Sequence, residues 1–290
     1  MEMRALKLAL PLSIALACAS SQGWAAPIFG ADLASFAVLG SAAVTNLPPS
    51  TIVGNVGVSP GGSITGFNSS PGVAVSDPQV TGGLVHATTA VAAQAQLDLD
   101  AAILTLNGMA NTGGTLAADL TGTRSPGVYE VLAGTTNLAG ALILDGGGSD
   151  GAVWVFRFAS TLITDAISNV SVTNVGDGSN VGIYWVVGSA ATLDGFTFVG
   201  NVLAHDDITS DGNLTLGCGR LLSDTTKVTL IQDTVSIGCG VGFGADSGDS
   251  GGFDQGPGNG PSGVPEPGTF VLAGLALAGL FSSRRRLPVA

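Results

Sequence analysis

The chain has 290 residues, of which 45 are glycine and only 10% are charged. Between residues 27 and 265 it carries four basic and nineteen acidic side chains, a formal net charge of −15. Such a surface repels phosphate backbones and anionic headgroups, which argues against binding to nucleic acid or to an anionic membrane surface. The length suffices for one domain with a sizeable core, and the apolar residues are mostly small or β-branched, as in narrow β-strands.

The first 26 residues have the three parts of a secretory signal peptide. Arg4 and Lys7 give a positive start, an apolar stretch runs from 8 to 19, and small residues at 23–25 precede a cleavage site. A short buried helix is the alternative interpretation. We expect the signal to be removed and the rest of the chain to be exported.

From residue 31 onward, short apolar runs alternate with glycine and proline turns, a pattern typical of short β-strands. A six-residue unit at 51–56 recurs almost unchanged at 197–202 and more loosely at 216–221. The last two copies are 19 residues apart. A unit this short cannot bury its own apolar face, so the sequence predicts a mainly β fold of stacked solenoid rungs.

Residues 84–106 differ from this pattern because they contain no glycine or proline. Apolar side chains recur there in steps of three or four, at Leu84, Ala87, Val91, Ala95, Leu99, Ala102 and Leu106. This spacing predicts one face of an amphipathic helix of about six turns. The helix lacks Lys and Arg, which argues against a membrane role. We expect it to cover one apolar face of the solenoid, with Asp98 and Asp100 toward solvent.

Residues 240–263 consist mainly of Gly, Ser, Asp and Pro and predict a flexible linker. The segment 264–290 then combines an apolar stretch at 269–281 with two flanking motifs, Pro265-Glu266-Pro267 and Arg284-Arg285-Arg286. This three-part order resembles the PEP C-terminal sorting signal of Gram-negative bacteria. The resemblance implies recognition by a membrane-embedded exosortase, transient membrane contact, removal of the tail and delivery to the cell surface or extracellular matrix. A plain membrane anchor is the alternative, for which the apolar stretch is short.

The stretch 32–237 resembles the microbial ice-binding proteins. The matching segments include 54–61, 126–129, 154–158 and 185–193. The resemblance implies that residues 27–239 form a right-handed discontinuous β-solenoid with one long α-helix packed alongside. It also implies a non-catalytic protein that binds ice through a flat face bearing loosely repeated Thr-Gly/Ala-X-Thr/Asn elements.

Regularly spaced methyl and hydroxyl groups on a rigid sheet can order water in an ice-like lattice. The resemblance places such groups just before each rung, and the candidate ice-binding residues are Thr45, Ser50, Thr65, Thr197, Asn213, Thr215 and Thr229. The family elements are eroded in this chain: Asp194-Gly195-Phe196-Thr197 begins with a strongly hydrated Asp, which we expect to disturb ordered water. A structural or adhesive protein of an exopolysaccharide matrix therefore stays open as a second function.

Two cysteines, Cys218 and Cys239, remain once the signal peptide is removed. They lie about one rung apart in an exported chain, which predicts a disulfide that staples the last coils. Two buried free thiols are the alternative. Two thiols with no neighbouring histidine pair do not form a zinc site, and we expect neither a metal nor a cofactor.

Three further motifs have both a chemical and a structural interpretation. The string Gly-Asp-Ser-Gly-Gly at 248–252 matches the surroundings of a trypsin-like nucleophile but falls in the predicted linker. His205-Asp206-Asp207 is similar to acid/base clusters of polysaccharide-cleaving β-helices, yet the chain has few basic residues to hold acidic sugars. Asp145, Asp150 and Asp177 offer oxygen ligands for calcium without the nonapeptide repeat of calcium-binding β-helices. We therefore predict polar turns at these positions and no enzyme.

Overall fold

The computed structural model describes residues 28–134, 136–149, 151–176, 181–195 and 197–238. This part of the chain is mainly β, with 22 strands, one long helix and one helix of a single turn, α1 (Ala31–Ala34). No helix among the described residues is long and apolar enough to cross a membrane. The predicted signal peptide, the linker at 240–263 and the sorting signal at 264–290 lie outside the described residues.

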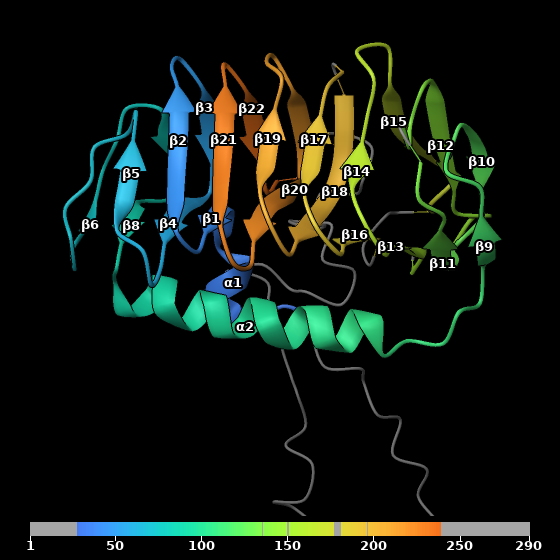
Figure 1. Ribbon diagram of the computed structural model, residues 1–290, viewed down its shortest axis with the longest axis horizontal. Coiled ribbons are helices and arrows are strands. Elements are labelled where there is room, and N and C mark those ends of the chain that lie inside the picture. Colours follow the sequence, from blue (N-terminus) through green and yellow to red (C-terminus); the bar gives the residue numbers. More distant parts are fainter. Residues whose placement is uncertain (1–27, 135, 150, 177–180, 196, 239–290) are drawn as a thin grey trace, which may run out of the picture.

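The strands fall into three rows, and successive strands of the chain belong to different rows, except for β8 and β9, which precede and follow the long helix (Figure 1). Strands within a row pair in parallel, except that β6 (Ala74–Val75) pairs antiparallel with β8 at one end. The row beside the long helix, called here the helix row, contains in spatial order β8 (Val85–Ala87), β4 (Asn55–Val58), β1 (Phe36–Gly40), the second halves of β20 (Thr215–Ser223) and β18 (Thr197–Ala204), β16 (Gly182–Val187), β13 (Val153–Phe158), β11 (Gly127–Val131) and β9 (Gly114–Leu116).

The other two rows are called the front face and the back face, after their places in Figure 1. The front face is a separate six-stranded sheet of β14 (Leu162–Ile163), β17 (Ala191–Leu193), β19 (Ile208–Ser210), β21 (Lys227–Ile231), β2 (Ala43–Leu47) and β5 (Ser63–Thr65). The back face contains β10 (Gly122–Arg124), β12 (Ala141–Asp145), β15 (Asn169–Thr173), the first halves of β18 and β20, β22 (Thr234–Ser236), β3 (Thr51–Val53) and β7 (Val80–Thr81).

Two long strands, β18 and β20, turn the corner between the back face and the helix row. The pairing of β18 with β20 shifts register between Val199 and Asn201. Gly200 occupies this corner with a φ of 101°, and a Cβ at that position would lie 2.6 Å from the side chain of Ile183. The repeated glycine of the six-residue unit is therefore required both by the backbone conformation and by the close approach of the neighbouring strand.

The spatial order of the strands differs from their order in the chain. Strand β1 pairs with β20 through Val38 and Leu221, and β2 pairs with β21 over five residues. Figure 1 accordingly shows the blue N-terminal strands beside the orange strands that end the domain. The long helix then runs along the helix row, and β9 begins at the opposite end of the stack.

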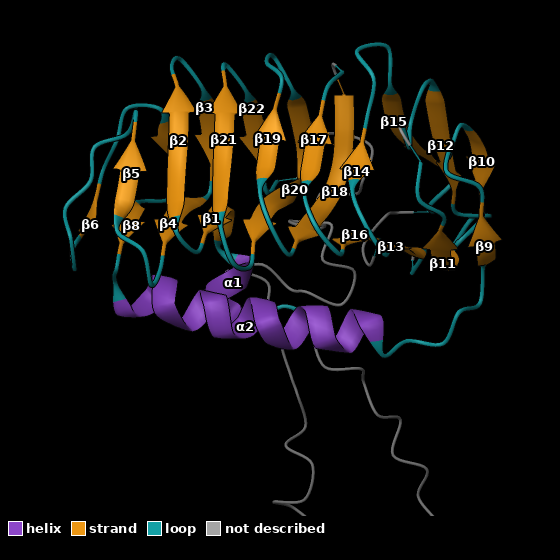
Figure 2. Ribbon diagram, viewed as in Figure 1, coloured by secondary structure: helices purple, strands orange, loops and turns teal. Residues whose placement is uncertain are grey.

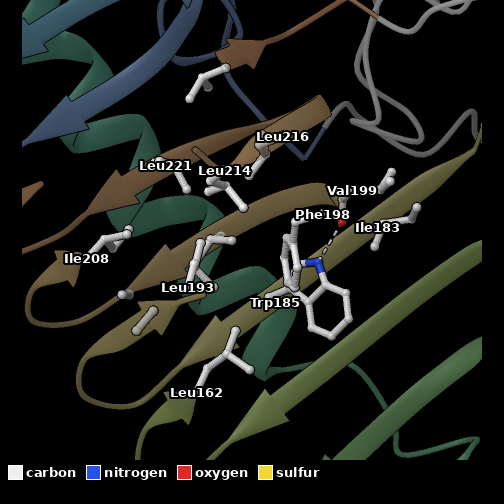
Figure 3. Packing of buried hydrophobic residues seen from close by; sticks show 14 of the residues in the cluster. Leu162, Ile183, Trp185, Leu193, Phe198, Val199, Ile208, Leu214, Leu216 and Leu221 are labelled. Carbon is white, nitrogen blue, oxygen red and sulfur yellow. Dashed lines mark hydrogen bonds between the residues drawn. The ribbon is translucent and has the colours of Figure 1, made fainter. Parts of the chain in front are cut away.

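The space between the three rows is filled by apolar side chains, one set from each rung (Figure 3). Aromatic rings from consecutive rungs stack within it. The ring centroids of Tyr129 and Phe156 are 5.4 Å apart, those of Phe156 and Trp185 are 4.6 Å apart, and those of Trp185 and Phe198 are 4.8 Å apart. The indole Nε1 of Trp185 donates to the carbonyl of Val199 at 2.9 Å. This stack of rings holds the four strands that carry them, β11, β13, β16 and β18, in register with one another.

The long helix, α2 (Ala90–Asn107), covers the outer side of the helix row (Figure 2). The prediction of one long helix packed alongside the sheet is confirmed. Its buried face consists of Ala92, Ala95, Gln96, Leu99, Ala102 and Leu106. Four of the seven predicted positions belong to this face.

The predicted helix start at residue 84 is wrong. Residues 85–87 form strand β8, and Thr89 caps the helix by accepting a hydrogen bond from the amide of Ala92 at 3.2 Å. Leu84 and Val91, both assigned to the inward face, are exposed. Apolar spacing could not separate the two elements because Ala87, three residues after Leu84 and four before Val91, fits a helical step although it belongs to strand β8. The cap at Thr89 depends on the extended backbone of that residue, which the spacing does not show.

Arg157 joins the C-terminal end of α2 to the helix row. Its guanidinium donates to the carbonyls of Asn107 and Met109, each at 2.8 Å, and lies 2.5 Å from a carboxylate oxygen of Glu130. The side chain is largely buried. It therefore satisfies carbonyl groups at the helix end that have no partner within the helix.

We expect the substitution Arg157→Ala to lower the free energy of unfolding by about 2 kcal/mol, because it leaves partly buried carbonyls and one half-exposed carboxylate without their hydrogen-bond donor. Urea denaturation followed by circular dichroism measures this change. The comparison variant is Lys227→Ala, which removes a half-exposed ion pair and should cost no more than about 1 kcal/mol. Equal midpoints for the two variants would contradict the proposed anchoring role.

Candidate functional site

Only two of the three rows present their outer side to solvent. The outer side of the helix row is buried under α1 and α2, where Phe29, Leu33, Leu99 and Leu106 are fully covered. Any contact with an extended surface therefore has to use the front face or the back face.

Five threonines form one continuous line across the front face. Thr65 pairs in register with Thr45, Thr45 with Thr229, Thr229 with Thr209, and Thr209 with Thr192. We call these five residues the front threonine row. Since hydrogen-bonded strands lie about 4.8 Å apart, the row repeats a methyl and a hydroxyl group at that interval over five strands.

Strand alternation explains why these side chains point outward. On β2, β19 and β21 the residues that flank each threonine are buried, namely Val44 with Asn46, Ile208 with Ser210, and Val228 with Leu230. The threonine between each pair of buried residues therefore points to the opposite side of the sheet. Threonine is branched at Cβ and has restricted rotamers, so the row is stiff as well as regular.

The surroundings of the front threonine row are almost free of charge. Lys227 is the only charged residue within the six described strands of the front face. It lies at the start of β21, and its Nζ is 3.6 Å from a carboxylate oxygen of Asp207. On the other side of the row, Leu47 pairs with Ile231. The strands that carry the hydroxyls are therefore nearly uncharged, whereas Asp194 and Asp211 follow directly after β17 and β19.

A buried polar network holds the ends of the front strands. One carboxylate oxygen of Asp233 accepts from the amide of Leu214 at 3.0 Å, and the other accepts from the amide of Ile231 at 2.9 Å and from the hydroxyl of Ser210. The amide of Asp233 donates to the hydroxyl of Ser50 at 3.0 Å. Burial raises the pKa of Asp233, while the three hydrogen bonds act in the opposite direction. This network fixes neighbouring rungs at the edge between the front and back faces.

Comparison with known sequences matches both halves of the sequence prediction. The Ice-binding-like family matches residues 38–236, and the PEP-CTERM protein-sorting motif matches residues 263–286. The chain belongs to the ice-binding-like family. The tail carries the sorting motif of proteins directed to export, and the predicted residues Pro265, Glu266, Pro267 and Arg284–Arg286 fall within the matched segment.

Similar proteins and structures agree with this family. An ice-binding protein of Nostoc sp. (strain HG1) is 38% identical over 207 residues, which cover 71% of this chain and 72% of the relative. A crystal structure of an ice-binding protein from an Antarctic biological consortium matches with a TM-score of 0.61 and 30% identity, covering 80% of this chain and 95% of that one. The ice-binding protein of the ascomycete Antarctomyces psychrotrophicus matches with a TM-score of 0.59 and 32% identity, covering 70% and 95%.

The seven candidate ice-binding residues separate into three groups. Thr45, Thr65 and Thr229 belong to the front threonine row, whereas Thr197 and Thr215 lie on the back face. Asn213 is exposed in the turn between β19 and β20, with a φ of 59°. A single ice-binding surface would require all seven residues on one face. The structure divides them between two faces and a turn.

Ser50 requires a correction. Its side chain is only 3% exposed, and its hydroxyl donates to Asn46 at 2.7 Å and accepts from the amide of Asp233. A hydroxyl engaged in this way inside the protein cannot contact a surface. Ser50 follows a double proline in a polar turn, and the sequence pattern alone gave no sign that the turn folds inward.

Thr192 and Thr209 belong to the front threonine row and were not among the candidates. Each stands between two residues that are buried in the structure, in Ala191-Thr192-Leu193 and Ile208-Thr209-Ser210. The family resemblance predicts contact residues just before each rung, whereas the front threonine row lies within the strands. Asp194, which we expected to disturb ordered water, follows β17 and caps its own turn through the amide of Gly195 at 2.8 Å.

The possible acid/base cluster at 205–207 is divided among separate contacts. His205 Nδ1 lies 3.0 Å from Asp224, and Asp207 pairs with Lys227. A cavity of about 320 Å³ opens beside His205, between α2 and the ends of β13 and β16. A hydrogen bond with Asp224 raises the pKa of Asp100 on the helix. The three consecutive residues therefore do not converge on one reacting position.

The remaining motifs have structural explanations or lie outside the described residues. Asp145 accepts from the amide of Gly147 and from the side chain of Asn174, each at 3.0 Å, and these bonds lower its pKa. No cluster of three metal-ligating side chains occurs in the described ranges. Asp150, Asp177 and the string at 248–252 are not described. Cys218 is buried and disulfide-bonded, while its predicted partner Cys239 lies beyond the described residues.

Proposed function

We propose that this protein binds ice through the front face, with Thr65, Thr45, Thr229, Thr209 and Thr192 as the contact residues. The front threonine row is the observation that carries the proposal, since five adjacent strands present the same side chain in one register. Its methyl groups are apolar and therefore favour the release of disordered water from the surface. Its hydroxyls offer hydrogen-bonding positions at a fixed interval. Both properties suit a periodic lattice of water molecules better than a flexible ligand.

The chemistry of the front face argues for a non-catalytic role and against a matrix adhesin. Sugar rings are commonly held by aromatic faces and by charged or amide groups in grooves, whereas the six described strands of the front face contain no aromatic residue and only one charged residue. The ice-binding relatives share the fold, and the front face supplies a neutral regular surface rather than a cleft. Binding to exopolysaccharide is therefore the weaker proposal.

For the whole domain, we infer a right-handed discontinuous β-solenoid extending over residues 27–239. The parallel pairing within three rows and the stacking of β1 on β20 support this interpretation. A disulfide from Cys218 to Cys239 would close the last rung, next to strand β22.

The proposed place of action is outside the cell. A signal peptide at 1–26 would start export, and an exosortase would recognise the motif that begins at Pro265 and release the chain after transient contact with the membrane. The surface or extracellular matrix of a Gram-negative bacterium is the destination that such a motif suggests. There the protein would meet ice growing from the surrounding water.

Thermal hysteresis and inhibition of ice recrystallisation by the purified protein test the proposed function. We expect a measurable gap between melting and freezing points, faceted ice crystals and small grains after annealing. Serum albumin at equal mass concentration is the control for nonspecific effects. Crystal growth indistinguishable from that in albumin, even at high protein concentration, would contradict ice binding.

A further inference from the structure

A second line of hydroxyl-bearing and amide side chains crosses the back face. Asn169 pairs in register with Thr197, Thr197 with Thr215, Thr215 with Thr234, and Thr234 with Thr51. We call these five residues the back row. All five are exposed, whereas four of the five residues of the front threonine row are half-buried.

The back row is held as firmly as the front threonine row. The residue after each member is a buried apolar side chain, at Val170, Phe198, Leu216, Val235 and Ile52. These side chains belong to the single core between the three rows of strands. The back row therefore cannot turn inward without removing core residues from their places.

The surface around the back row is neutral. The five strand segments that carry it, in β15, the first halves of β18 and β20, β22 and β3, contain no charged residue. Two residues further along these strands, Val53 pairs with Ser236, and the buried Val199 pairs with Gly217. In a chain with 21 acidic residues, five adjacent strand segments without a charge would make a poor docking site for a protein partner that relies on ion pairs.

We propose that the back face is a second ice-contacting face, so that the protein presents two threonine-bearing surfaces that meet along one edge. This inference rests on the proposed function. The two faces are continuous, because Asp233 links the front strand β21, through the amide of Ile231, to Thr234, the next residue in the chain and a member of the back row. The ligand of the back face is again the water lattice of ice. The back row is more exposed than the front threonine row and includes one asparagine, Asn169.

Two rows with different exposure and composition should select different planes of the ice crystal. The front threonine row consists of threonine alone and is bordered by Leu47 and Ile231. The back row combines threonine with Asn169 and is bordered by valine, serine and glycine. The two surfaces therefore offer different side chains, and differently exposed ones, to the ice lattice.

The test uses fluorescently labelled protein bound to a single-crystal ice hemisphere, which displays the planes that are occupied. Four proteins are compared: the wild type, Thr209→Tyr on the front face, Thr215→Tyr on the back face, and Thr105→Tyr. Thr105 is an exposed threonine of α2 that belongs to neither face, so its variant is the matched control. Unchanged melting temperatures confirm that each variant is folded, and Thr234→Tyr replaces Thr215→Tyr if that variant does not fold.

We expect the wild type and Thr105→Tyr to label two sets of planes, and each face variant to lose one set and keep the other. A Thr215→Tyr pattern identical to the wild type, together with loss of all labelling in Thr209→Tyr, would overturn the second face and leave the proposed function intact. A wild type that labels no plane would overturn both.

Discussion

Replacing Thr229 by tyrosine should weaken binding to ice about tenfold, which corresponds to roughly 1.4 kcal/mol of lost contact free energy, and thermal hysteresis should fall accordingly. Thr229 is the middle residue of the front threonine row, paired with Thr45 on one side and Thr209 on the other. A tyrosine ring that projects from the sheet at this position would keep the strands on both sides of β21 from contacting a flat ice surface. The back face would supply the activity that remains.

The control for this prediction is the same substitution at Thr105, on the exposed side of α2. Thr105→Tyr should keep full hysteresis, because the helix lies against the helix row and away from the front face. Thr229→Ser is the conservative variant, since it keeps the hydroxyl and removes the methyl group. A Thr229→Tyr variant with normal hysteresis and a normal melting temperature would show that ice does not contact the front face.

The substitution Arg220→Ala should lower the free energy of unfolding by about 3–5 kcal/mol, the largest stability effect that we expect in the domain. Arg220 is fully buried. Its guanidinium donates to the carbonyl of Ala34 at 2.6 Å and to the side chain of Asn201 at 2.8 Å, and lies 5.2 Å from the centre of the Phe29 ring. It thus ties the N-terminal segment to β18 and β20.

Urea unfolding of the wild type, Arg220→Ala and Arg220→Lys measures this effect. Lysine keeps the charge but not the planar fork of donors, so Arg220→Lys should also be destabilised. An unfolding midpoint for Arg220→Ala equal to that of the wild type would contradict the anchoring role. Both variants should bind the same planes of ice as the wild type at temperatures where they are folded, because Arg220 lies on neither exposed face.

The sequence predicted the short β-strands and the helix because both are local patterns. The recurring unit at 51–56 and 197–202 marks equivalent corners, and its first residues, Thr51 and Thr197, both belong to the back row. The buried face of α2 follows from steps of three and four residues at Ala95, Leu99 and Ala102. In each case the information lies within one segment of the chain.

The front threonine row could not be predicted in the same way, because it depends on which strands are neighbours. Thr45 and Thr229 are far apart in the chain and meet only because β2 pairs with β21. No local pattern reveals that the first rungs stack on the last ones. Burial of Ser50 is a second example, since it depends on Asp233 in a rung at the other end of the sequence.

The partition of the protein into slowly growing ice tests the central claim most directly. Wild-type protein should be concentrated in the ice fraction, and Thr105→Tyr should behave in the same way. The double variant Thr209→Tyr/Thr229→Tyr, with two rings on adjacent strands of the front face, should be incorporated clearly less than the wild type, and the back face should account for the part that still enters the ice. Equal incorporation of the wild type and the folded double variant would contradict the assignment of ice binding to the front face.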